Sequence, residues 1–117
     1  MGSLKKSKVA VFLALVVAAT LAIAVPASAA TVSVTAGKPS EFKFTIPSSV
    51  KAGKVTFKVK NAGKVPHDFS IAGKKTPLLK PGASASLTVT LKKGKAAYLC
   101  TVPGHAQAGM KGTLTVK

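Results

Sequence analysis

Four side chains in the sequence carry atoms that bind transition metals well. Cys100, His105 and Met110 fall within eleven residues of one another, and His67 lies further upstream. After residue 30 they are the only cysteine, histidine and methionine residues in the sequence. Two imidazoles and a thiolate, with a weak axial thioether, form the ligand set of a blue-copper site. We therefore expect these four residues to bind one copper ion that alternates between Cu(I) and Cu(II).

Each of these residues, taken singly, has a simpler explanation. A lone cysteine is usually a small core residue, and a lone methionine usually fills space in a core. The copper interpretation depends on the whole set, because all of these donors fall in one ligand pattern. Zinc is the competing metal, but structural zinc sites use more thiolates or four strong ligands, and catalytic zinc seldom combines Cys and His with Met.

The sequence offers little for catalysis. Glu41 and Asp68 are its only carboxylates and lie in separate parts of the chain, which disfavours paired acid–base chemistry. Cys100 with a histidine resembles a cysteine nucleophile, but such a site would not need Met110. No glycine-rich phosphate loop precedes a helix. We therefore expect a protein that is not an enzyme.

The predicted ligands must be positioned by strands, because polarity after residue 30 alternates with a period of two residues. The clearest case is Lys54–Lys60, where Val55, Phe57 and Val59 share one side and lysines alternate with them. In Glu41–Ile46 we expect Phe42 to share the inner side with Phe44 and Ile46. The other expected strands are Thr31–Thr35, Phe69–Ile71, Ser84–Leu91, Ala96–Cys100 and Thr113–Val116.

Turns rich in glycine, proline and asparagine separate these runs, at residues 36–39, 47–49, 51–53, 61–63, 72–73, 80–82 and 93–94. Short strands with turns about every ten residues predict an antiparallel β-sandwich or barrel whose lysine-bearing faces are exposed to solvent. The loops of a sandwich gather at the ends of its sheets, where the loop Cys100–Met110 can meet His67. Pro103, Gly104 and Gly109 suit tight turns in that loop.

The first 29 residues are expected to form a signal peptide. Lysines near the start precede the uncharged apolar run Val9–Val25, and Ala27-Ser28-Ala29 supplies small residues before the cut. The alternative is an uncleaved membrane anchor, although the run is short for a spanning helix. We expect a signal peptide at 1–29, one domain at 30–117, and a periplasmic, extracellular or cell-surface location. A single unpaired cysteine is unusual in an exported protein, and metal binding would explain it.

The chain is strongly basic, with a formal charge of +16 that comes from lysine without arginine. This charge favours an acidic redox partner and contact with an anionic cell surface. A solvated outer surface that keeps the protein soluble explains the lysines equally well. Nucleic acid is disfavoured, because export separates the protein from it and arginine, the main residue of groove and phosphate recognition, is absent.

Two segments resemble the cupredoxins of the plastocyanin/azurin kind. Tyr98–Gly112, with Cys100, His105 and Met110 in order, is similar to their ligand loop, and Asn61–Phe69 is similar to the segment that carries their first histidine. The resemblance extends from Phe42 to the C-terminus. It implies a Greek-key β-sandwich of about seven to eight strands and a mononuclear type 1 copper centre.

One residue departs from the family pattern. Cupredoxins commonly have asparagine directly after the first histidine, where it hydrogen-bonds near the thiolate and ties two loops together. Here the residue is Asp68. A carboxylate near a thiolate disfavours negative charge on both groups. We therefore expect Asp68 to be protonated, turned away from the thiolate or paired with a lysine.

The function expected from these features is one-electron transfer by a monomer. His105 is expected to reach the surface among Val102, Pro103, Ala106 and Ala108, which would form an apolar docking patch for transient partners. The first alternative is extracytoplasmic copper storage or delivery by the same ligands. The second is a cell-surface interaction protein whose lysines bind anionic polymers.

Overall fold

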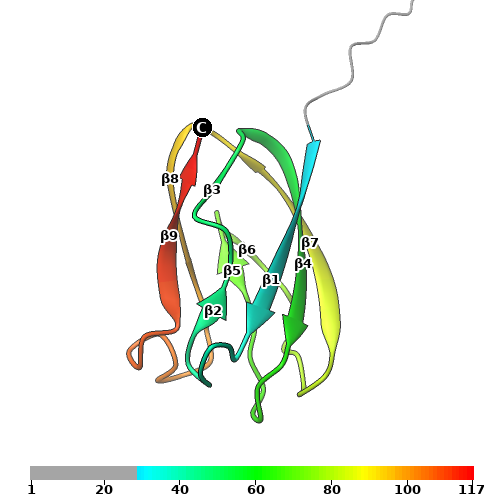
Figure 1. The fold of residues 1–117 in the computed structure, drawn as a ribbon, viewed down its shortest axis with the longest axis vertical. Helices are drawn as coiled ribbons and strands as arrows, with labels where there is room; N and C mark the ends of the chain where they lie inside the picture. The colour runs from blue at the N-terminus through cyan, green and yellow to red at the C-terminus, as the bar shows by residue number, and fades with distance from the viewer. Residues whose placement is uncertain (1–28) are drawn as a thin grey trace, which may run out of the picture.

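The computed structural model of the protein describes residues 29–117, which form two β-sheets packed face to face (Figure 1). One sheet contains, in spatial order, β2 (Phe44–Thr45), β1 (Ala29–Ala36), β4 (Gly53–Asn61) and β7 (Ser84–Leu91). The other contains β3 (Ser49–Val50), β9 (Lys111–Val116), β8 (Gly94–Leu99), β5 (Ser70–Ile71) and β6 (Lys74–Lys75). Within this range the chain has no helix long and apolar enough to span a bilayer.

The sandwich forms because alternate side chains of each long strand are apolar. In β4, Val55, Phe57 and Val59 are buried, while the lysines between and beside them are exposed. The inner face of β9 contributes Leu114 and Val116 to the same core. The aromatic rings of the core stack edge to face or tilted against one another, and they come from Phe44, Phe57, Phe69 and Tyr98. The predicted β-sandwich is confirmed.

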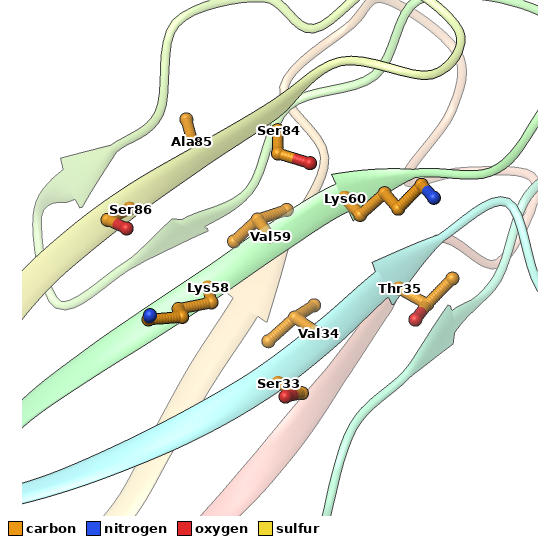
Figure 2. Close-up of a pocket in the computed structure, with 9 residues that line it drawn as sticks. All are labelled: Ser33, Val34, Thr35, Lys58, Val59, Lys60, Ser84, Ala85 and Ser86. Atoms are coloured by element: carbon orange, nitrogen blue, oxygen red, sulfur yellow. The ribbon is translucent and has the colours of Figure 1, made fainter.

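The outer face of the four-stranded sheet carries hydroxyl groups and lysines, as expected for its solvated side. Figure 2 shows Lys58 and Lys60 on β4, between the hydroxyl residues of β1 and β7. The register places Lys58 opposite Ser33 on one side and Ser86 on the other. These side chains line a shallow groove that is separate from the loops holding the predicted ligands.

Two expectations about the sheets were wrong. The sheets are mixed rather than antiparallel, since β1 pairs in parallel with β4 and β3 pairs in parallel with β9. Parallel neighbours arise where the chain leaves a sheet and returns in the same direction. The second error concerns β3 and β6, which were not predicted. Each has two residues, too few for alternation to be read from sequence.

The expected strand Glu41–Ile46 is also shorter than predicted. Only Phe44 and Thr45 pair with β1, and the residues before them form a turn. Phe42 was expected on the inner side with Phe44, but it is 37% exposed. Because the chain turns here, Phe42 and Glu41 lie beside His105 and His67 instead of continuing a strand.

The two ends of the sandwich differ, because the predicted ligands lie at one end only. Cys100 follows the end of β8, and Met110 precedes the start of β9. Ala36, at the end of β1, packs against both residues. The start of β1 and the C-terminus therefore lie at the other end, as Figure 1 shows. The predicted signal peptide lies outside the described residues, except for Ala29, the first residue of β1.

Candidate metal centre

Three of the four predicted ligands come together at one end of the sandwich. Nδ1 of His67 lies 3.2 Å from Nδ1 of His105. Sγ of Cys100 lies 4.0 Å from the first of these nitrogens and 3.6 Å from the second. A point equidistant from the three atoms lies about 2.1 Å from each, close to the bond lengths of imidazole nitrogen and thiolate to a first-row metal ion. The residues therefore fit a copper ion in a trigonal plane.

His67 is held by the backbone on both sides. Its N–H donates to the carbonyl of Leu79, and its carbonyl accepts from the N–H of Leu79, at 3.1 and 2.8 Å. The loop before it is braced by Asn61, a fully buried residue at the end of β4. The Asn61 amide group donates to the carbonyls of Val65 and Leu79, and its oxygen accepts from the N–H of Gly63. The ring of His67 is therefore fully buried and fixed in orientation.

The other three predicted ligands come from the loop between β8 and β9. The Cys100 N–H donates to the carbonyl of Met110 at 3.0 Å, which closes the loop at its base. Inside it, the N–H of Met110 donates to the carbonyl of His105, also at 3.0 Å. Gly104 and Gly109 have positive φ angles of 85° and 113°, so the glycines make the tight turns expected of them.

Met110 is fully buried, and it packs in a small cluster with Cys100 and Ala36. This places its side chain next to the thiolate residue at the base of the loop. The position is consistent with the predicted axial ligand, which stays a prediction.

Sequence reasoning missed Glu41. Its Oε2 lies 2.6 Å from Nε2 of His67, on the side of the ring away from Cys100. The backbone N–H of Lys64 donates to the carboxylate. This hydrogen bond is the main reason that the pKa of Glu41 is lowered, and the contact with His67 is the second. The only signal in the sequence was the scarcity of acidic residues in a lysine-rich chain.

Asp68 ties the two ligand-bearing loops together. Its Oδ1 accepts from the backbone N–H of Thr101 at 2.6 Å, and its Oδ2 accepts from the Thr101 hydroxyl. The Asp68 N–H donates to Sγ of Cys100 at 3.4 Å. Among the expected alternatives, the carboxylate is turned toward Thr101, and it makes no ion pair with a lysine of residues 29–117. The aspartate therefore makes the loop connection that the family resemblance assigned to asparagine.

The local electrostatics favour the uncharged forms of Cys100 and His105 in the metal-free protein. Burial raises the pKa of Cys100, and the nearby carboxylate of Asp68 adds to the rise, whereas two backbone N–H groups oppose it. Burial, followed by the proximity of His67, lowers the pKa of His105. At neutral pH the ring of His105 is therefore uncharged and has a lone pair for a metal.

The surface above His105 is apolar. Three large hydrophobic side chains of residues 29–117 are exposed, and all three lie at this end of the molecule: Phe42, Val65 and Leu78. The ring of Phe42 packs edge-on against His105 with a centroid distance of 4.9 Å. Val65, Leu78, Val102 and Pro103 line a groove of about 460 Å³ that reaches the half-buried His105. The apolar surface is therefore broader than the expected patch.

Comparisons with known proteins agree with this geometry. The profile of the family described as "Copper binding proteins, plastocyanin/azurin family" matches residues 27–117. Auracyanin-B of Chloroflexus aurantiacus is 55% identical over 42 residues, which are 35% of this chain and 18% of that protein. The copper-resistant cuproprotein CopI of Pseudomonas aeruginosa is 51% identical over 41 residues, or 34% of this chain and 23% of that protein. These matches span less than a quarter of each relative's length.

A solved structure of auracyanin B superimposes with a TM-score of 0.62 at 28% identity. The alignment covers 75% of this chain and 88% of that one. Because the family profile spans the whole described sandwich with its His67, Cys100 and His105 cluster, the chain belongs to the plastocyanin/azurin family of copper-binding proteins and has the cupredoxin fold.

Proposed function

We propose that the protein is an exported one-electron carrier, in which His67, Cys100, His105 and Met110 hold a single copper ion as a type 1 centre. The observation that carries the proposal is the triangle of two imidazole nitrogens and one sulfur, held in place by the fold. Copper bound there supplies a Cu(I)/Cu(II) couple, which a mixed thiolate and imidazole set accepts in both oxidation states.

The residues around the ligands keep the site rigid and dry. His67 and Cys100 are 0% and 1% exposed, and their loops are cross-linked through Asp68 and Thr101. A site whose ligands are fixed before the metal binds changes little on reduction, which favours fast electron transfer.

The surface around His105 supports docking of a redox partner. His105 is the only one of the four ligands that is not buried, and the exposed Phe42, Val65 and Leu78 surround it. An apolar patch of this kind allows brief contact and rapid release. The lysines of residues 29–117, which form no ion pair with Glu41 or Asp68, would steer an acidic partner toward this end.

The direct test is to add Cu(II) to the purified protein and record the visible spectrum. A strong thiolate-to-copper band is expected, because Cys100 supplies the thiolate. Cys100→Ser should abolish the band, whereas Met110→Leu should shift it and keep it, since an axial thioether contributes weakly. A colourless parent protein would contradict the proposal.

A second function, copper storage or delivery, is favoured by the likeness to CopI, a copper-resistant cuproprotein. The same ligands would serve it. Reducing the bound copper distinguishes the two functions. A centre that cycles between oxidation states and retains copper supports electron transfer, whereas a centre that releases copper to a chelator once reduced supports delivery.

A further inference from the structure

The Glu41 carboxylate contacts Nε2 of His67, the ring nitrogen that does not face the other predicted ligands. Nδ1 of His67 points to His105 and Cys100, and Nε2 contacts Oε2 of Glu41 at 2.6 Å. His67 is fully buried, and the side chain of Glu41 is 26% exposed. The contact joins two loops that are far apart in the sequence.

The position of Glu41 is determined by its surroundings. Its carboxylate accepts hydrogen bonds from the backbone N–H of Lys64, at 2.8 and 3.0 Å to its two oxygens, and a longer one from Val65 at 3.4 Å. Gly63 leaves room for it, because a Cβ at that position would collide with Oε2 of Glu41 and approach Nε2 of His67 to 3.0 Å. The carboxylate therefore sits in a space bounded by backbone and by the ring.

We propose that Glu41 is a positioning residue, which keeps the His67 ring in the tautomer with a proton on Nε2 and a lone pair on Nδ1 aimed at the copper position. An ionised carboxylate can only accept a hydrogen bond, so it selects the ring that donates from Nε2. Such outer partners of a ligating histidine fix its tautomer and raise its basicity as a donor. The inference rests on the proposed role of His67 as a ligand.

The negative charge of Glu41 also distinguishes between the two oxidation states. It lies directly behind a ligand and stabilises the more positive Cu(II) more than Cu(I). Removing that charge should weaken Cu(II) binding more than Cu(I) binding and raise the reduction potential.

The test compares the parent protein with Glu41→Gln. An amide has nearly the same shape, but it can accept from Nε2 or donate to it, so it no longer selects one tautomer. Long-range proton–nitrogen NMR spectra of the metal-free proteins report the protonated ring nitrogen directly. We expect Nε2–H for His67 in the parent and a mixture of tautomers in Glu41→Gln.

Copper titration and voltammetry give the second readout. We expect the Cu(II) dissociation constant of Glu41→Gln to rise by about 10- to 100-fold, with a higher reduction potential. Ser86→Lys is the matched control, since it changes the net charge by the same amount on the outer sheet face. It should leave the dissociation constant and the tautomer as in the parent.

The results of these experiments test the role of Glu41 separately from the proposed function. A parent with the proton on Nδ1 of His67 overturns it, even if Glu41→Gln fails to fold. Equal tautomers, dissociation constants and potentials in parent and Glu41→Gln also overturn it. Failure of the parent to bind copper would contradict the proposed function, whereas the metal-free spectra would still decide the role of Glu41.

Discussion

At the scale of single residues, Cys100 and His105 differ in whether they must lose a proton before they can bind copper. Burial holds the pKa of the Cys100 thiol above its ordinary range, so the metal-free protein keeps the proton on sulfur at neutral pH. Burial also lowers the pKa of His105, so its ring is already neutral there. Copper must therefore displace one proton, the proton of Cys100, from this pair of ligands.

The pH dependence of copper affinity follows from that proton. Apparent Cu(II) affinity should rise by about tenfold per pH unit between the His105 and Cys100 titrations, because deprotonating the thiol becomes easier as pH rises. Competition with a chelator of known affinity, measured at several pH values, checks this.

Asp68→Asn provides the control. It removes a carboxylate that helps to raise the thiol pKa, so the rise in affinity should level off at a lower pH. An affinity that does not change with pH would mean that the thiol is already ionised in the metal-free protein.

At the scale of elements, three polar side chains connect the loops at the metal end. Asn61 braces the loop before His67, Asp68 bonds to Thr101 after β8, and Glu41 reaches His67 from the turn before β2. Each of these side chains links loops that are not joined by strand-to-strand hydrogen bonds. The ligand positions therefore depend on these connections as well as on the strands.

Gly63 tests how closely these loops are packed. Gly63→Ala should weaken copper binding and destabilise the protein by about 1–3 kcal/mol, because the added methyl group displaces Glu41 or His67. Denaturant unfolding and copper titration measure the two effects.

Gly94→Ala is the comparison at the opposite end of the sandwich. Gly94 has a φ of 129° and open space around it. Its replacement should cost about 1–2 kcal/mol of backbone strain and leave copper binding unchanged. Equal copper affinity in Gly63→Ala and the parent would show that the Gly63 loop tolerates expansion.

Sequence alone could predict the strands whose alternation extends over many residues and the ligands whose side-chain type is rare. The strands β4 and β7 and the donors His67, Cys100 and His105 are of this kind. It could not predict β3 or β6, because two residues carry no period. Glu41 was missed because its contact with His67 joins two loops that no sequence pattern pairs, and Phe42 was misplaced because the chain turns where alternation suggested a strand.

At the scale of the whole molecule, the surface charge is almost entirely cationic. The carboxylates of Glu41 and Asp68 are engaged at the metal end, and no lysine among residues 29–117 pairs with either. Lys43 and Lys64 lie beside the ligand loops, whereas Lys58 and Lys60 lie on the outer sheet face. Lysines of equal charge thus stand at different distances from the proposed docking patch.

This difference predicts where an anionic redox partner is steered. With hexacyanoferrate(III) as acceptor, the double variant Lys43→Glu and Lys64→Glu should lower the second-order oxidation rate by about tenfold at low ionic strength. The double variant Lys58→Glu and Lys60→Glu, with the same net charge, should lower it less. Stopped-flow rates at several salt concentrations measure both effects, and equal losses would mean that only net charge matters.

Because the predicted ligands lie at one end of the sandwich only, the domain can be joined to a surface or to another protein through its other end. The start of β1 and the C-terminus lie at the same pole, opposite the ligand loops (Figure 1). A linker, an electrode-binding tag or a host protein joined at either end would leave the copper pole facing outward. Since the start of β1 and the C-terminus share that pole, residues 29–117 are suited to insertion into a surface loop of another protein as a copper-binding module.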